Sequence, residues 1–110
     1  MSEKMLKFVN LGQQTPPKRR VNDRKDDFNE IYKEFISSTA KEQSSRCSQC
    51  GVPFCQVHCP LSNNIPDWLK LTAEGRLLEA YELSQSTNNM PEICGRICPQ
   101  DRLCEGNCVI

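Results

Sequence analysis

The sequence has few of the residues that build a large apolar core or a membrane segment. Of its 110 residues only 6% are aromatic and 37% are hydrophobic, and a chain this short rarely folds stably on such a core without a further constraint. No apolar run reaches the ~18 residues that a membrane-spanning helix needs. We therefore expect no membrane association, and we expect a non-hydrophobic element to hold the fold together.

The sequence also lacks net charge, because 14 basic residues balance 14 acidic ones. It therefore lacks the basic excess typical of proteins that bind nucleic acid. The charge is uneven: residues 1–46 hold 10 Lys and Arg against 7 Asp and Glu, and residues 47–110 hold 4 against 7. This offset, +3 against −3, suits either ordinary solvated surfaces or a basic arm that docks on an acidic partner.

Residues 1–9 contain no apolar block of the kind found in a secretory signal. The sequence therefore predicts a cytoplasmic protein in a reducing environment, where clustered cysteines bind metal more often than they form disulfides.

Helical patterns dominate the rest of the chain. From Asp27 onward the apolar residues recur with the spacing of one stripe of an amphipathic helix, and this pattern predicts a helix whose stripe packs in the core. The stripe comprises Phe28, Ile31, Tyr32, Phe35 and Ile36. Thr39 and Glu42 fit a capping box, which predicts a second helix reaching Ser45.

Two further helices are predicted between the cysteine-rich stretches. Asn64 as N-cap, Pro66 in the first turn and Gly75 as a stop predict one over 64–75. Residues 76–86 predict its antiparallel partner, and a short helical turn follows from Asn88 to the next cysteine. No segment alternates apolar and polar residues, so the predicted fold class is all-α, with short helices and cysteine-rich loops. The polar, proline-broken start predicts an extended arm over 1–23, followed by the helical domain over 24–110.

Eight cysteines are the most informative residues, and all lie between positions 47 and 108. The first run has the spacing C-x2-C-x4-C-x3-C-P and comprises Cys47, Cys50, Cys55 and Cys59. The second has the spacing C-x3-C-P-x4-C-x3-C and comprises Cys94, Cys98, Cys104 and Cys108. Two runs of four thiolates suffice for two four-iron clusters.

The Cys-Pro steps indicate how the ligands divide. In the two-cluster ferredoxin arrangement the cysteine before proline ligates the other cluster. That logic predicts cluster one at Cys47, Cys50, Cys55 and Cys108. It predicts cluster two at Cys59, Cys98 and Cys104, with Cys94 as the candidate for the fourth place.

Other uses of these cysteines are possible in principle. Two structural zinc sites would also use eight thiolates, but zinc ribbons favour paired C-x2-C knuckles and only one such pair is present. A disulfide scaffold lacks its secretory signal. A Rieske centre needs two histidines, and His58 is the only one in the chain. The sequence therefore favours two [4Fe–4S] clusters, with a zinc-binding structural interaction domain as the alternative.

Longer motifs extend this prediction to a family. The chain contains Cys50-Gly51-Val52-Pro53-Phe54-Cys55, then Ile65-Pro66-Asp67-Trp68, and finally Cys98-Pro99-Gln100-Asp101-Arg102-Leu103-Cys104-Glu105-Gly106-Asn107-Cys108. Over residues 18–110 it resembles the small (β) subunits of NADPH-dependent glutamate synthases. It is also similar to the N-terminal module of dihydropyrimidine dehydrogenase and related flavoproteins, which implies an α-helical ferredoxin-like domain holding two [4Fe–4S] clusters.

This resemblance implies an oxidoreductase subunit that relays electrons from NADPH, through FAD, to a large (α) subunit that makes glutamate. It equally suits the electron-transfer module of a paralogous flavin-dependent reductase. The family's FAD- and NADPH-binding domains have glycine-rich loops that these 110 residues lack, so the chain is expected to be a fragment. In dihydropyrimidine dehydrogenase a downstream glutamine completes the second cluster, which leaves Cys94 as either the fourth ligand or a spare thiol.

Overall fold

The structure is a computed structural model, and it describes residues 5–34 and 37–110. Within these residues it is helical, and its only strand-like pairing is one isolated bridge. The elements, in chain order, are η1 (Lys7–Val9), α1 (Val21–Lys25), α2 (Ser37–Ser44), α3 (Phe54–His58), α4 (Ile65–Ala73), α5 (Leu77–Ser86), α6 (Pro91–Ile97), η2 (Gln100–Arg102) and η3 (Glu105–Asn107). The predicted all-α class is confirmed.

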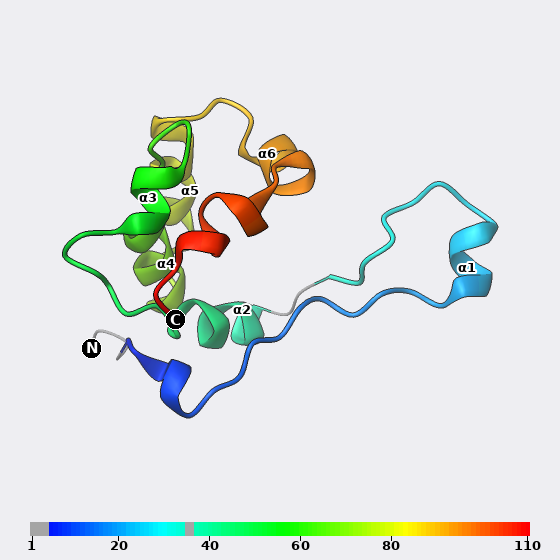
Figure 1. Cartoon of the computed structure of the whole chain (residues 1–110). Coiled ribbons are helices and arrows are strands. Elements are labelled where there is room, and N and C mark those ends of the chain that lie inside the picture. The colour runs from blue at the N-terminus through cyan, green and yellow to red at the C-terminus, as the bar shows by residue number, and fades with distance from the viewer. Residues whose placement is uncertain (1–4, 35–36) are drawn as a thin grey trace.

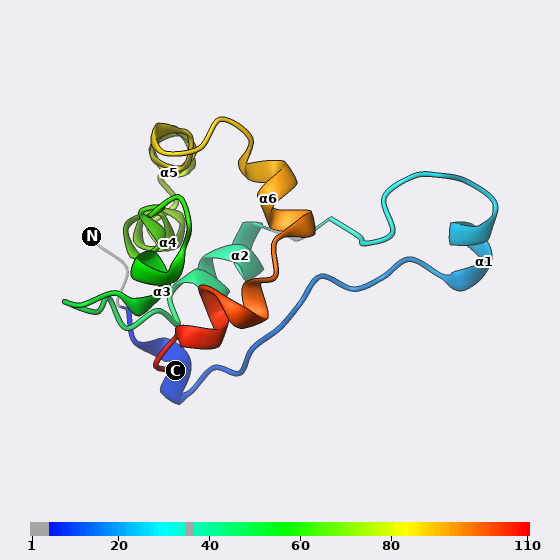
Figure 2. The same ribbon diagram turned by 45° about the horizontal axis from the view of Figure 1, so that its top comes forward.

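The centre of the body is the predicted hairpin of α4 and α5, with α2 packed across α4 (Figure 1). Helix α3 contacts both α4 and η3, so the hairpin lies beside the two cysteine-rich stretches. Seen from above, α4 and α5 lie side by side while α1 stands far from both (Figure 2). No helix of the described residues is long and apolar enough to cross a membrane.

Local signals set the ends of α4 as the sequence predicts. Asn64 is the N-cap residue and Pro66 lies in the first turn, where its missing N–H costs nothing. The Asn64 side chain does not cap the helix, because its Oδ1 accepts a hydrogen bond from Gln56 Nε2 instead. Gly75 ends the helix with a left-handed φ of 81°, a conformation that glycine adopts without strain.

Replacing Gly75 by alanine is expected to destabilise the α4–α5 hairpin. The new Cβ would lie 2.8 Å from Lys41 Cε, and a non-glycine residue at this φ costs about 1–3 kcal/mol. Thermal unfolding followed by circular dichroism should therefore show a lower melting temperature. Gly12→Ala is the matched control, because its Cβ would meet nothing within 4 Å; equal melting temperatures for the two variants would contradict the argument.

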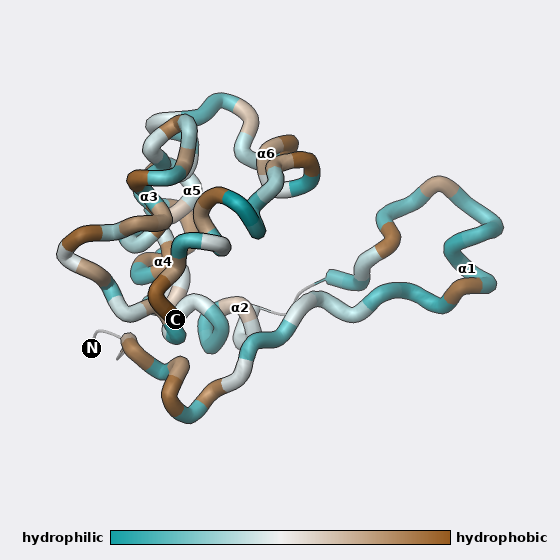
Figure 3. The backbone as a smooth tube through the Cα atoms, in the orientation of Figure 1, coloured by the Kyte–Doolittle hydropathy of each residue, from teal (hydrophilic) through white to brown (hydrophobic). Residues whose placement is uncertain are grey.

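The apolar core is small. Among the described residues only two hydrophobic side chains are fully buried, Ala73 at 2% and Ala80 at 8% exposure, both on the hairpin. Larger apolar side chains on α5, including Leu78 and Tyr81, are exposed. Hydrophobic stretches, coloured brown, lie at both ends of the described chain (Figure 3), and Val9 and Val109 in these stretches are exposed. So little burial leaves the packing of the cysteine-bearing elements weakly supported by the hydrophobic effect.

The predicted helix from Asp27 onward is wrong. Residues 17–33 instead form a projecting β-hairpin-like loop, in which Lys18 and Tyr32 pair. The Arg19 N–H donates to the Ile31 carbonyl at 2.8 Å, and the Lys33 N–H donates to the Pro17 carbonyl at 2.7 Å. These cross-hairpin bonds take backbone groups that a helix over 27–34 would use.

The apolar stripe of that predicted helix does not reach a core. Phe28 is fully exposed, and Ile31 and Tyr32 are exposed as well, whereas Phe35 and Ile36 lie outside the described residues. The hairpin extends away from the helical body, so it offers an amphipathic stripe no surface to pack against (Figure 1).

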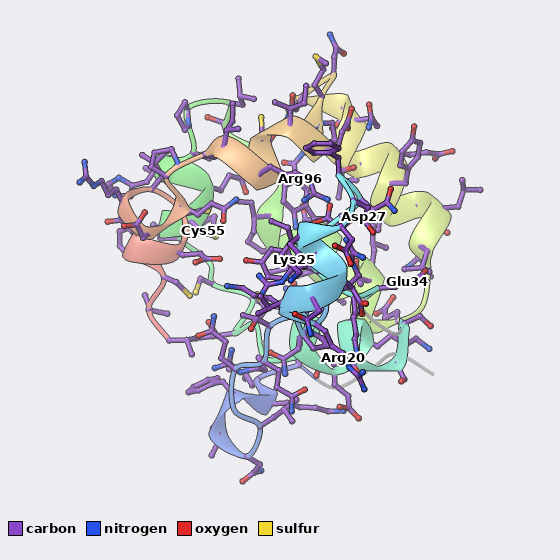
Figure 4. The ribbon with its side chains drawn as sticks, turned by 90° about the vertical axis from the view of Figure 1, so that its right-hand side faces the viewer. Arg20, Lys25, Asp27, Glu34, Cys55 and Arg96 are labelled. Atoms are coloured by element: carbon purple, nitrogen blue, oxygen red, sulfur yellow. The ribbon has the colours of Figure 1, made fainter. Side chains whose placement is uncertain are left out.

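An ion pair closes the hairpin near its tip. Arg19 Nη2 lies 2.7 Å from Asp27 Oδ1, and the Arg19 Nε donates to the Glu30 carbonyl. The hydrogen bond from this guanidinium lowers the pKa of Asp27 below its usual value. Figure 4 looks onto α1 at the hairpin tip, with Asp27 beside it and Cys55 on α3 to one side. Glu30 also pairs with Arg96 of α6, which ties the hairpin to the body.

The N-terminal segment, residues 5–14, runs along α2 to the first cysteine. The Leu6 N–H donates to the Cys47 carbonyl at 3.0 Å, and Arg46 Nε donates to the Leu11 carbonyl at 2.8 Å. The Gln43 side chain bonds the backbone on both sides of Gln13: it donates to the carbonyl of residue 12 and accepts from the N–H of residue 14. This part of the predicted arm thus lies against the chain that leads into the first cysteine run.

Helix α2 confirms the predicted second helix but not its capping box. The helix already includes Ser37, so Thr39 lies inside it and does not cap it. It ends at Ser44, and the Ser45 hydroxyl donates to the Glu42 carbonyl at 2.6 Å. Ser45 is completely buried, which holds the exit from α2 in place just before the cysteines begin.

Candidate iron–sulfur site

The first cysteine run occupies a loop and a short helix. Cys47 and Cys50 lie in the loop between α2 and α3, Cys55 lies on α3, and Cys59 is the C-cap of α3. Pro60 follows, and a residue before proline is driven out of the helical region; Cys59 has an extended φ and ψ of −74° and 124°. The Cys-Pro step therefore ends α3 at Cys59.

The second run repeats this arrangement. Cys94 lies within α6, and Cys98, which precedes Pro99, is its extended C-cap. Cys104 precedes η3 and Cys108 follows it. Gly106 is required in this last turn, because a Cβ there would clash with the carbonyl group of Asp101. Close packing of η2 against η3 thereby sets the positions of the last two cysteines.

A cavity of about 670 Å³ lies between the two runs. Five of the eight cysteines line it: Cys47, Cys50, Cys55, Cys104 and Cys108. Its walls also include Ile65, Trp68 and Leu69 of α4, and the C-terminal residues 109 and 110. All four cysteines predicted for cluster one thus border one cavity with a partly apolar wall.

The structure does not bring the predicted ligands of cluster two into one cavity. Cys104 lines the cavity just described, whereas Cys59, Cys94 and Cys98 do not. Cys104 is nonetheless close enough to Cys98 for their charges to interact. The Cys94 Sγ accepts a hydrogen bond from Asn88 Nδ2 at 3.2 Å. His58 is exposed on α3 and does not line the cavity.

Burial affects two of the thiols that line the cavity. It raises the pKa of Cys55, with further contributions from the neighbouring Cys47, Cys108 and Cys104, and burial also raises the pKa of Cys104. Both free thiols are therefore protonated near neutral pH. Thiolate is the form that binds metal, so metal binding here would release protons and would neutralise several negative charges held close together.

A single zinc ion and a [4Fe–4S] cluster need different spacings between their thiolate ligands. Four thiolates bound to one zinc ion lie about 3.8 Å apart, given a Zn–S bond of about 2.3 Å. Within residues 5–34 and 37–110, no three His, Cys, Asp or Glu side chains form a group that could hold one ion. A [4Fe–4S] cluster spaces its ligands more widely, because each thiolate binds a different iron. All eight cysteines are free thiols, and the five that line the cavity include the four predicted for cluster one, which is the number of thiolates that such a cluster requires.

Comparison with known proteins agrees with this donor set. Residues 24–110 match the family described as dihydropyrimidine dehydrogenase domain II, 4Fe–4S cluster. The chain belongs to this family. Its resident cofactor is therefore of the [4Fe–4S] type, as the cysteine spacing predicts.

Several known proteins are similar in sequence to nearly the whole of this chain. The glutamate synthase [NADPH] small chain of Azospirillum brasilense is 71% identical over 109 residues, covering 99% of this chain and 23% of that protein. The small chain of Escherichia coli (strain K12) is 52% identical over 110 residues, covering 100% and 23%. AegA of the same strain, provisionally named an oxidoreductase, is 49% identical over 96 residues, covering 86% and 15%. The chain thus spans about a quarter of the length of the small chains.

Sequence reasoning missed two polar residues beside the sulfurs of this iron–sulfur domain. Ser48 Oγ lies 3.0 Å from Cys50 Sγ, and Gln49 Nε2 lies 3.3 Å from Cys47 Sγ. Their position between two ligand cysteines was the available signal, since side chains inside a C-x2-C turn lie close to its sulfurs. Trp68, from the Ile65–Trp68 motif, is partly buried and lines the cavity.

Proposed function

We propose that this chain is the iron–sulfur electron-transfer module of an NADPH-dependent glutamate synthase small subunit. The observation that carries the proposal is the cavity bordered by Cys47, Cys50, Cys55 and Cys108 in a chain 71% identical to such a small chain. We further propose cluster one at these four cysteines and cluster two at Cys59, Cys98, Cys104 and Cys94. The arm over 1–23 and the cluster-bearing domain over 24–110 remain the proposed division of the chain.

The residues around the cavity suit electron transfer. A bound [4Fe–4S] cluster supplies one-electron oxidation and reduction. Trp68 and Leu69 exclude water from one side of the cavity, while the exposed Cys108 leaves another side close to the surface. A partly enclosed site with one ligand at the surface protects the metal and still allows electrons to pass to a partner.

In the whole protein, electrons would come from NADPH through FAD bound outside these 110 residues. They would leave to the large (α) subunit, which makes glutamate. We propose a cytoplasmic location because clustered thiols persist in reducing compartments.

Anaerobic purification tests the cofactor. The protein should be brown, contain iron and acid-labile sulfide in equal amounts, and lose its visible absorbance on reduction with dithionite. A folded, colourless, zinc-containing protein would instead support the structural zinc domain.

A related flavin-dependent reductase is the second candidate, favoured by the 49% identity with AegA. Association with the large subunit distinguishes the two. The full-length protein, mixed with the glutamate synthase large subunit, should form a complex that oxidises NADPH only when 2-oxoglutarate and glutamine are present. A cluster-containing protein that forms no such complex would support the reductase.

A further inference from the structure

Two side chains within the first C-x2-C turn are hydrogen-bonded to ligand sulfurs. Ser48 Oγ lies 3.0 Å from Cys50 Sγ, and Gln49 Nε2 lies 3.3 Å from Cys47 Sγ. The backbone N–H of Gln49 points to the same Cys47 sulfur at 3.4 Å. When both cysteines are thiolates they can only accept, so Ser48 becomes the donor in its bond. Two of the cluster-one sulfurs therefore accept three hydrogen bonds.

The amide of Gln49 is held in this position from its other side. Its Nε2 also donates to the Pro66 carbonyl at 2.7 Å, so both of its N–H groups have acceptors. Gln49 has a left-handed φ of 54°, which folds the turn around the Cys47 sulfur. Gln49 thus connects the ligand loop to the first turn of α4, and its amide is held between the Cys47 sulfur and the Pro66 carbonyl.

The proposed ligands of cluster two have fewer such bonds. Among the side-chain hydrogen bonds of the described residues, only one reaches a cluster-two sulfur: Asn88 Nδ2 donates to Cys94 at 3.2 Å. The Cys104 sulfur accepts from the backbone, at Glu105. Hydrogen bonds to the sulfurs of an iron–sulfur cluster set its reduction potential. They stabilise the reduced form more than the oxidised form, because the reduced form carries one more negative charge.

We propose that Ser48 and Gln49 are positioning residues that raise the reduction potential of cluster one and leave that of cluster two unchanged. This inference rests on the proposed function, since it requires a cluster at Cys47, Cys50, Cys55 and Cys108. It goes beyond that function by assigning the difference between the two clusters to two named side chains that bind no metal themselves.

Redox titration of the cluster-loaded, full-length protein, followed by electron paramagnetic resonance, tests this assignment. Ser48→Ala and Gln49→Leu should each lower the midpoint potential of one cluster. In the double variant, the ratio of reduced to oxidised cluster one at a fixed potential should fall about tenfold. This corresponds to a midpoint potential lower by about 59 mV for a one-electron couple. The other cluster should titrate as in the unmodified protein.

Two controls separate hydrogen bonding from loss of structure. Ser48→Thr keeps the hydroxyl and should keep the potential. Gln56→Leu removes an amide of the same kind whose Nε2 donates to Asn64 and not to sulfur, so it should leave both potentials unchanged. Ser48→Ala does not disturb the contact between Gln49 and Pro66, so its shift cannot arise from a displaced α4.

Each result has a distinct meaning. Unchanged potentials in Ser48→Ala and Gln49→Leu with both clusters present would overturn the inference and leave the proposed function standing. Equal shifts in both clusters, or an equal shift in Gln56→Leu, would also overturn it. An unmodified protein that binds no iron would overturn the proposed function itself.

Discussion

Removal of iron is expected to unfold residues 47–108. The two fully buried hydrophobic residues of the described chain are both alanines of the α4–α5 hairpin, so the cysteine-bearing loops and α3 depend on metal for their packing. Binding of a structural metal contributes on the order of 10 kcal/mol in small domains, which exceeds what such a small core supplies. Anaerobic treatment with an iron chelator should abolish most of the helical circular dichroism.

The control for this experiment is the same chelator already saturated with iron. Hydrogen exchange should locate the unfolding, with protection lost in α3, α4 and α6. Unchanged circular dichroism after complete removal of iron would show that the helices fold on their own packing.

In the proposed ligand assignment, each cysteine run gives one ligand to the cluster held mainly by the other run. This crossed assignment leads to a second prediction with a large expected effect. Cys59→Ala should destroy cluster two and spare cluster one, although Cys59 belongs to the first cysteine run. Cys108→Ala should do the reverse. Each variant should lose about half of its iron, because each cluster contains four iron atoms.

Trp68 shows which cluster remains, because it lines the cavity of cluster one. The fluorescence of Trp68 is obtained by subtracting the signal of the same variant with Trp68→Phe. It should stay quenched in Cys59→Ala and rise in Cys108→Ala. A rise in Cys59→Ala and none in Cys108→Ala would reject the crossed ligand assignment.

Local signals explain why the helices between the cysteine runs were predictable. Pro66, Gly75 and Pro91 mark helix ends through their own backbone restrictions, which act whatever the rest of the chain does. The observed helices α4, α5 and α6 match these signals closely.

Residues 17–33 were mispredicted because their structure depends on pairing across the chain. The bonds that join Arg19 to Ile31 and to Asp27 link residues 8 to 12 positions apart, and a helical stripe is read from neighbours three and four apart. The pattern of Phe28, Ile31 and Tyr32 is present, but no apolar surface lies opposite it.

The sequence predicted which cysteines act together, but not what surrounds them. Their spacing and the Cys-Pro steps predict that Cys47, Cys50 and Cys55 act with Cys108, and these four border one cavity. It did not indicate that Cys104 borders the same cavity. Nor did it indicate that Ser48 and Gln49 contact sulfur, since a donor's direction depends on the conformation of the turn.

The cavity joins the first and the last cysteine of the chain, Cys47 and Cys108. During synthesis the ribosome releases Cys47 long before Cys108, so the last ligand of cluster one is missing until the whole domain has emerged. Closing so long a loop also has an entropic cost that a metal centre must offset. The proposed ligand set therefore predicts that cluster one is inserted late in biogenesis, and that a nascent chain stalled before Cys108 exposes the thiols of Cys47, Cys50 and Cys55 to oxidation.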